Sequence, residues 1–136
     1  MLVYRYMCLE ELNKVMAGVE ISSDNKFKKF RTTSEGICFL PEVVKFWSDS
    51  INSNVEFSPV DCFRFLYGVV SSSSILVEFE TKEELNQSSG VYADPYTDDW
   101  DATICIDELC TKSYNRDTFI PKRYSFSNEN IWYNLV

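Results

Sequence analysis

The chain has 136 residues, of which 45% are hydrophobic and 15% aromatic, with a net charge of −8 and no histidine. This length suits one domain over residues 1–136, and the apolar content suffices for a core, which excludes a disordered chain. The absence of histidine excludes Ser-His-Asp triads, Cys-His dyads and histidine-based zinc enzymes, while the negative charge argues against direct nucleic-acid binding.

The N-terminal third is expected to contain a strand, a helix and a second strand. Residues 2–7 are rich in Val and Tyr and predict the first strand. Residues 9–17 place apolar side chains on one face and predict a helix, which Gly18 ends. Residues 19–34 are polar and basic, which indicates a loop with up to one strand, and residues 36–40 predict the next strand.

Two further helices are expected before residue 70. Pro41 suits the first turn of a helix that runs to about residue 51. Ser58 and Pro59 have the residue types of an N-cap and a first helical position, and Gly68 suits the end of that helix.

The second half predicts mainly strands. Residues 75–80 alternate in polarity, which is typical of a half-buried strand. Residues 81–84 have capping-box spacing and predict one short helical turn, and residues 88–90 predict a turn. Residues 91–101 predict an acidic loop, and residues 102–109 predict another strand.

The C-terminal part predicts one more strand and a docked end. Residues 119–126 form the strand, with Pro121 indicating a sheet edge or a bulge. Residues 131–133 are apolar enough to dock on the domain. The sequence therefore predicts a single α+β domain with a mixed or antiparallel sheet and about three helices, mostly in the first half.

The cysteines indicate a reducing compartment. Their number is odd and no Cys-x-x-Cys occurs, so neither a disulfide framework nor a metal site is expected; they are Cys8, Cys38, Cys62, Cys105 and Cys110. The N-terminus lacks the pattern of a signal peptide, and no apolar stretch approaches the length of a membrane span. We therefore expect a protein of the host-cell cytoplasm, with no membrane contact.

The negative charge belongs to one stretch, residues 78–108, which we call the acidic segment. It holds ten acids and one base, a net charge of −9, whereas the other 105 residues hold 11 acids and 12 bases. The segment is either a solvated face that keeps the protein soluble or a landing surface for a basic partner. Aromatic side chains lie among its acids, as in many interfaces. The candidate partner-binding residues are Glu83, Glu84, Tyr92, Asp94, Tyr96, Asp98, Asp99, Trp100 and Asp101. These acids lack the alternating spacing of a calcium loop.

Two short stretches are basic. Residues 26–31 interleave Lys and Arg with Phe, and residues 112–123 carry four bases. Such stretches can bind a phosphate or a single strand, but a strand with its aromatic rings on the core and solvated bases between them is the favoured interpretation.

Three polar features could carry chemistry. Arg5 lies within the first strand beside Val3 and Met7, so it either forms a structural ion pair or clamps a phosphate or carboxylate. Glu108 follows apolar residues on one strand face, so it is either a functional carboxylate or an acid at a frayed strand end. Residues 32–34, Thr-Thr-Ser, either cap local backbone or bind a ribose or phosphate.

These features together resemble the ADP-ribosyltransferase fold of the Arg-Ser-Glu type over about residues 2–110. The resemblance implies that Arg5 holds the phosphates of NAD, that Ser34 lines the pocket, and that Glu108 steadies the developing oxocarbenium ion. Protein-modifying members carry Glu or Gln two positions before the catalytic Glu, where this chain has Ile106. The resemblance therefore fits an enzyme or a non-catalytic descendant.

The short, acidic, Asn-, Ser-, Lys- and Phe-rich chain is also similar in style to proteins of phages and mobile elements, many of which disable host machines such as CRISPR effectors. Two hypotheses follow. The first is a non-enzymatic protein without a cofactor that docks on and inhibits a basic host protein, including one that itself binds nucleic acid. The second is an NAD-dependent ADP-ribosyltransferase that uses Arg5, Ser34 and Glu108.

Overall fold

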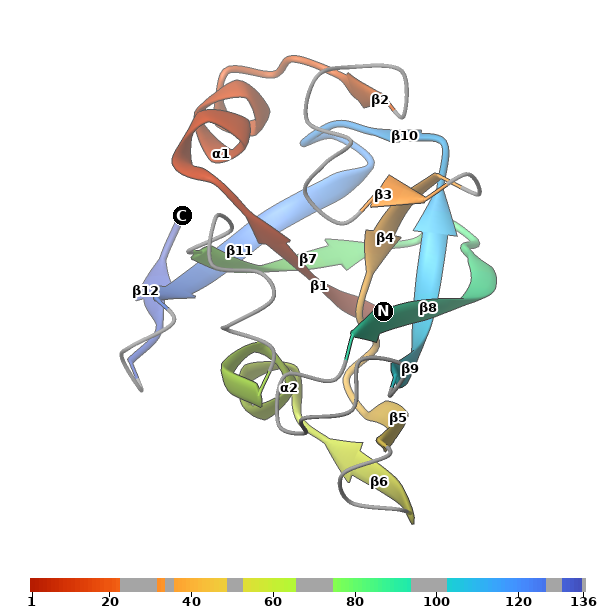
Figure 1. The fold of residues 1–136 in the computed structure, drawn as a ribbon. Helices are drawn as coiled ribbons and strands as arrows, with labels where there is room; N and C mark the ends of the chain where they lie inside the picture. Colours follow the sequence, from red (N-terminus) through yellow and green to blue (C-terminus); the bar gives the residue numbers. More distant parts are fainter. Residues whose placement is uncertain are drawn as a thin grey trace.

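The computed structural model describes residues 1–22, 32–33, 36–48, 53–65, 75–93, 103–126 and 131–135. Within these ranges the chain forms twelve strands and two helices (Figure 1). The helices are α1 (Leu9–Met16) and α2 (Pro59–Phe65). The strands are β1 (Leu2–Met7), β2 (Ile21–Ser22), β3 (Thr32–Thr33), β4 (Gly36–Phe39), β5 (Val44–Ser48), β6 (Ser53–Phe57), β7 (Ile75–Thr81), β8 (Asn86–Ala93), β9 (Thr103–Thr111), β10 (Ser113–Tyr114), β11 (Phe119–Phe126) and β12 (Tyr133–Asn134).

The predicted α+β class with about three helices is wrong, because the described residues are mostly β. The stretch 41–51, predicted as a helix, contains β5, which lies between β6 and β9. Val44 is buried and Lys45 is exposed, as the two-residue period of a strand requires. Pairing with two neighbouring strands outweighed the helix-compatible apolar spacing. Residues 81–84 form no helical turn, and the predicted turn at 88–90 lies inside β8.

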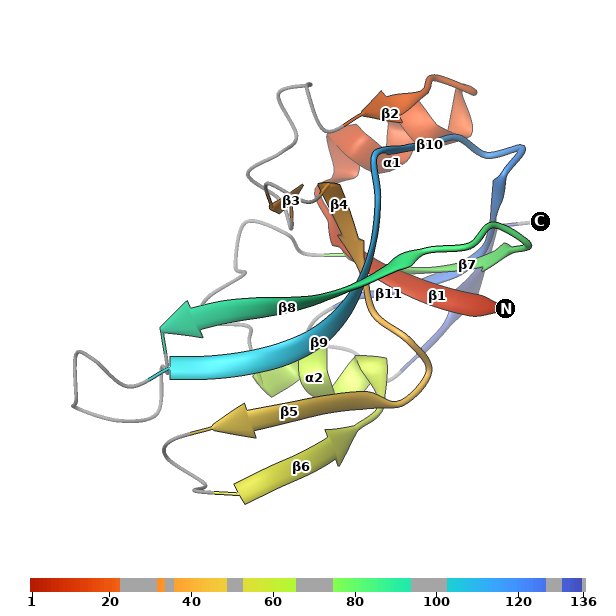
Figure 2. The same ribbon diagram turned by 90° about the vertical axis from the view of Figure 1, so that its right-hand side faces the viewer.

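The strands form three antiparallel sheets. The first has the order β1-β7-β11-β12, and the smallest pairs β10 with β2. In the largest, β9 pairs with β8 along one edge, while β4 and then β5 pair along its other edge (Figure 2). β6 extends this sheet beyond β5, and β3 extends it beyond β4.

Strand β7 is buried on both faces, although its alternating sequence predicted a half-buried strand. Ile75, Val77 and Phe79 belong to one core cluster and Leu76 belongs to another, so the first sheet has a cluster on each side. Its polar residue Glu78 is only 5% exposed. Alternate residues of β7 therefore face two different cores, and neither face is turned to solvent over most of its length.

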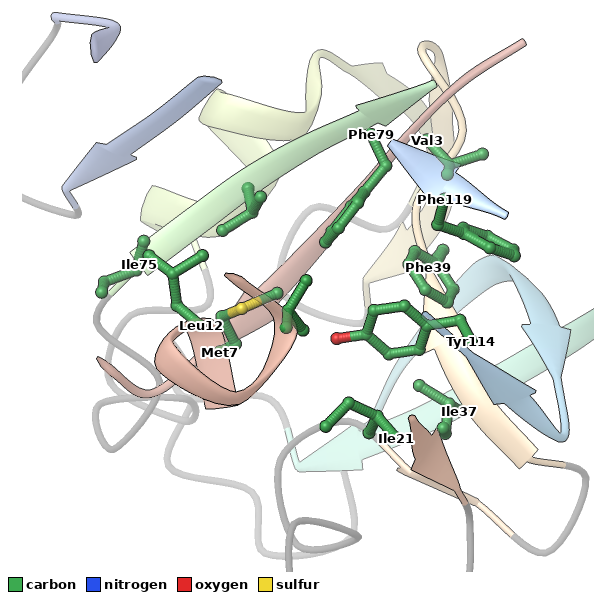
Figure 3. Close-up of a cluster of buried hydrophobic side chains, with 12 residues drawn as sticks. Val3, Met7, Leu12, Ile21, Ile37, Phe39, Ile75, Phe79, Tyr114 and Phe119 are labelled. Carbon is green, nitrogen blue, oxygen red and sulfur yellow. The ribbon is translucent and has the colours of Figure 1, made fainter. Parts of the chain in front are cut away.

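The first core cluster lies between the first sheet, α1 and β4 (Figure 3). Phe39 stacks on Phe119 with ring centroids 4.9 Å apart and meets Tyr114 edge-on at 5.2 Å. Helix α1 contributes Leu12 and Val15 to this cluster. The second cluster lies on the other side of β1 and includes Tyr4, Tyr6, Leu40, Val44, Cys62, Leu76, Ile104 and Ile106.

Several local predictions are confirmed. After α1 the backbone of Gly18 has a φ of +81°, and the N–H of Val19 donates to the carbonyl of Lys14, as in a Schellman motif. The hydroxyl of Ser58 accepts a hydrogen bond from the N–H of Asp61 at the start of α2. The register of β11 against β7 shifts just after Pro121, which marks the predicted bulge.

The C-terminal residues dock, as their apolar sequence predicted. β12 pairs with β11 through Tyr133 and Tyr124, whose rings stack at 5.2 Å. The guanidinium of Arg123 lies 4.4 Å from the ring centroid of Trp132, which is a cation–π contact.

Candidate functional site

Arg5 forms a buried ion pair with Glu11. Its Nε and Nη2 atoms donate to the two carboxylate oxygens of Glu11 at 2.7 and 2.9 Å, and its Nη1 donates to the carbonyl of Cys38 at 3.0 Å. The hydroxyl of Tyr114 also donates to Glu11, at 2.9 Å. Arg5 is 1% exposed and Glu11 is 0% exposed. All three groups therefore satisfy one another inside the core, and the interpretation of Arg5 as a structural ion pair is confirmed.

The charges of this cluster fix its protonation states. Burial alone would lower the pKa of Arg5. The charge of the Glu11 carboxylate and its hydrogen bonds to Arg5 raise the pKa and outweigh burial, so the pKa of Arg5 lies above its ordinary value. Burial, and then the negative charge of Glu11, raises the pKa of Tyr114 well above its ordinary value. On the other side of β1, burial and a hydrogen bond to Glu78 raise the pKa of Tyr4. Both tyrosines therefore stay neutral in the folded state at alkaline pH.

The raised pKa values of Tyr4 and Tyr114 in the folded state predict that the protein loses stability at alkaline pH. Above about pH 10 the unfolded tyrosines lose their protons while folded Tyr4 and Tyr114 keep theirs, so the free energy of unfolding falls as pH rises. Each tyrosine contributes about 1.4 kcal/mol per pH unit in this range. Urea unfolding at a series of pH values should show a shallower decline for the Tyr4→Phe/Tyr114→Phe variant than for the parent chain. Equal slopes for the two proteins would contradict the assignment.

Arg5 and Glu108 share their strand faces with members of different core clusters. Glu108 shares the inward face of β9 with Ile104 and Ile106, which belong to the second core cluster, whereas Arg5 lies beside Val3 of the first cluster. Glu108 is 2% exposed and β9 continues to Thr111, so the interpretation as an acid at a frayed strand end is wrong. The prediction that Arg5 and Glu108 share an NAD site therefore gains no support from their strand neighbours, which belong to different core clusters.

The third predicted element of that site is described only in part. Residues 32 and 33 form β3, which pairs with β4. Ser34 lies outside the described residues. The carboxylate that binds Arg5 comes from Glu11, which the sequence reading did not single out. Its position four residues before Val15, on the inward face of the helix, was the available signal.

The acidic segment divides into buried and exposed acids. Glu78 accepts two hydrogen bonds from Arg123, each 2.9 Å long, and one from Tyr4 at 2.8 Å. With Glu108 also buried, two of the six acids of this segment that the structure describes lie in the interior. The exposed acids that the structure describes are Glu80, Glu83, Glu84 and Asp107.

Three of these exposed acids line two hollows that share residues of β8 and β9. Glu83 and Glu84 line a hollow of about 660 Å³ together with Gln87 and Leu109. The same Gln87 and Leu109 also line a second hollow of about 370 Å³, which includes Asp107. The apolar rim of the second hollow includes Val43, which is 54% exposed. Acids, an amide, apolar side chains and the two bases Lys45 and Lys82 therefore share one surface. We call it the hairpin surface because Gln87 of β8 and Leu109 of β9 line both hollows.

Most of the predicted partner-binding residues fall between β8 and β9 in the chain. Tyr92 belongs to β8, whose backbone is described there. Six others lie outside the described residues: Asp94, Tyr96, Asp98, Asp99, Trp100 and Asp101. In the sequence these six residues stand between β8 and β9.

Three of the four bases in the stretch 112–123 contact other parts of the chain. Arg116 donates to the carbonyl of Met16 at 2.6 Å, Lys122 lies 3.9 Å from Glu80, and Arg123 binds Glu78. The other basic stretch, 26–31, lies outside the described residues.

None of the five cysteines forms a disulfide. Cys38 and Cys110 face each other across β4 and β9 with their sulfur atoms 3.5 Å apart. In the part of the chain that the structure describes, no three metal-ligating side chains are close enough to hold a metal ion. Neither of the two described helices has the length and apolar character needed to cross a membrane.

Comparison with protein-family models, with curated proteins and with solved structures finds no match for this chain.

Proposed function

We propose that this chain is a small acidic binding protein that docks on, and inhibits, a basic host protein inside the host cell, in the manner of phage anti-defence or host-takeover proteins. One observation carries the proposal: residues 78–108 concentrate a charge of −9 on a chain that is otherwise nearly neutral. The hairpin surface presents Glu83, Glu84 and Asp107 to solvent beside apolar side chains. Such a surface combines electrostatic steering with contact area.

The ADP-ribosyltransferase function stays a prediction and gains no support from Arg5. The guanidinium that would hold the phosphates of NAD already binds Glu11 and the carbonyl of Cys38 within the core. Freeing it would leave the buried carboxylate of Glu11 without its cation, which is energetically costly.

Reversal of three acids tests the proposal. The variant Asp98→Lys/Asp99→Lys/Asp101→Lys should lose capture of the basic protein that the parent chain retains from host lysate, as identified by mass spectrometry. Its thermal midpoint should stay close to that of the parent, so that the loss of capture reports on binding and not on unfolding.

A matched control separates the local surface from total charge. The variant Glu20→Lys/Asp61→Lys/Asp117→Lys makes the same change in net charge at exposed acids outside the acidic segment. It should retain capture. Capture by the first variant at the parent level would contradict the proposal, as would equal loss by both variants.

A further inference from the structure

Strand β8 forms an outer edge of the largest sheet. It pairs with β9 at eight successive positions, from Asn86 opposite Cys110 to Ala93 opposite Thr103, with no shift of register. Among the described strands, β9 is the one that pairs with β8. In an antiparallel strand, alternate residues direct their backbone N–H and C=O groups to opposite sides. About half of the backbone polar groups of β8 therefore point away from β9.

Strand β8 itself carries no charged side chain, proline or bulge, three of the features that protect edge strands. Exposed edge strands commonly carry a charged side chain, a proline or a bulge, or are very short, because these discourage pairing with another chain. The eight residues of β8, Asn-Gln-Ser-Ser-Gly-Val-Tyr-Ala, contain no charged residue and no proline. By contrast, the edge strand β6 carries Glu56, while β3 and β12 have only two residues each.

The C-terminal half of β8, residues 89–93, is the part best suited to accept another strand. Val91 is 63% exposed, the largest exposed fraction among the exposed large hydrophobic residues of the described chain. β-Branched side chains favour strand pairing and supply contacts for the side chains of an added strand.

The charges that flank β8 in the sequence indicate the chemistry of the added strand. The exposed Glu83 and Glu84 precede β8, and four aspartates follow it between residues 94 and 101. An extended segment with apolar residues in its centre and Lys or Arg at both ends matches this arrangement. Backbone hydrogen bonds would supply affinity, and the flanking charges would select a basic partner.

We propose that β8 binds its partner by strand addition: a basic, extended protein segment pairs with residues 89–93 and continues the β8–β9 sheet. This inference rests on the proposed function and specifies how docking occurs. It requires no change in the fold, because the accepting strand is already formed and held by β9.

The test uses a synthetic peptide that alternates Thr and Val over six residues and carries two Lys or Arg residues at each end. Calorimetry with the full chain should detect binding. Amide hydrogen exchange followed by NMR should show new protection at alternate residues within 89–93. A second peptide of identical sequence, N-methylated at alternate backbone positions, should bind about tenfold more weakly or worse, because it retains every charge but cannot form the ladder.

The outcomes separate the two proposals. If both peptides bind equally and the amides of residues 89–93 gain no protection, strand addition is overturned, whereas the acidic docking function stands as long as the Asp98, Asp99 and Asp101 reversals abolish capture. If the unmethylated peptide does not bind at all, strand addition is likewise overturned. If peptide binding shows the expected protection but the three reversals leave capture unchanged, strand addition is supported and the acidic docking function fails.

Discussion

Replacing Glu11 by leucine is expected to destabilise the fold by about 3–5 kcal/mol, because it leaves the charge of Arg5 buried without its carboxylate. Tyr114 loses its acceptor in the same change. Domains of this size are commonly stable by only about 5–15 kcal/mol, so the variant should be largely unfolded at moderate urea concentrations at which the parent stays folded. Equilibrium urea unfolding followed by tryptophan fluorescence measures the difference.

A compensating variant keeps this prediction decisive even if Glu11→Leu fails to fold. The triple variant Arg5→Met/Glu11→Leu/Tyr114→Phe removes every charged or hydroxyl group of the cluster together, so no buried polar side chain of this set is left unpaired. It should recover most of the lost stability. The exposed control Glu20→Gln should change the free energy of unfolding by less than about 0.5 kcal/mol. If Glu11→Leu were as stable as the Glu20→Gln control, Glu11 would not be the group that compensates the buried charge of Arg5.

Gly36→Ala is the second change with a large expected effect. The residue has a φ of +130°, which side chains of L-residues rarely adopt, and an added Cβ would collide with the backbone carbonyl of Thr111 on β9. Backbone strain and displacement of β4 from β9 should together destabilise the fold by about 3 kcal/mol or more.

Gly18→Ala is the matched control for that change. Gly18 also has a positive φ, of +81°, but the nearest atom to an added Cβ is the Nε of Arg116 at 3.8 Å, an ordinary contact. This variant should lose only about 1–2 kcal/mol, the strain of the left-handed conformation. Thermal and urea unfolding should be measured for Gly36→Ala and Gly18→Ala. The difference between their losses of unfolding free energy gives the cost of the collision with the Thr111 carbonyl. Equal losses would contradict the close approach of β4 and β9.

The sequence predicted best the elements whose signals are local. The bounds of β1 and β11, the glycine that ends α1 and the serine that begins α2 all follow from neighbouring residues. It predicted worst the elements whose identity depends on distant strands. Residues 44–48 carry apolar side chains at spacings that fit a helix, and only pairing with β6 and β9 makes them a strand.

The candidate site shows the same limit. The sequence indicated that Arg5 needs an anionic partner, but not whether Glu11, six residues away, or Glu108 supplies it. A helix that returns over the strand brings Glu11 to Arg5, and that geometry depends on how the chain turns at Cys8. Similarly, counting the charge of the acidic segment did not reveal that Glu78 and Glu108 face the interior.

The association rate constant at increasing salt concentration tests the central claim, docking through the acidic segment, most directly. It should be measured by stopped-flow between the chain and the captured basic protein. For the parent chain we predict a fall of about tenfold or more between low and physiological ionic strength, and for the Asp98, Asp99 and Asp101 reversal a slow rate that no longer falls with salt. A parent rate constant that does not depend on salt, or one that the reversal leaves unchanged, would contradict the account.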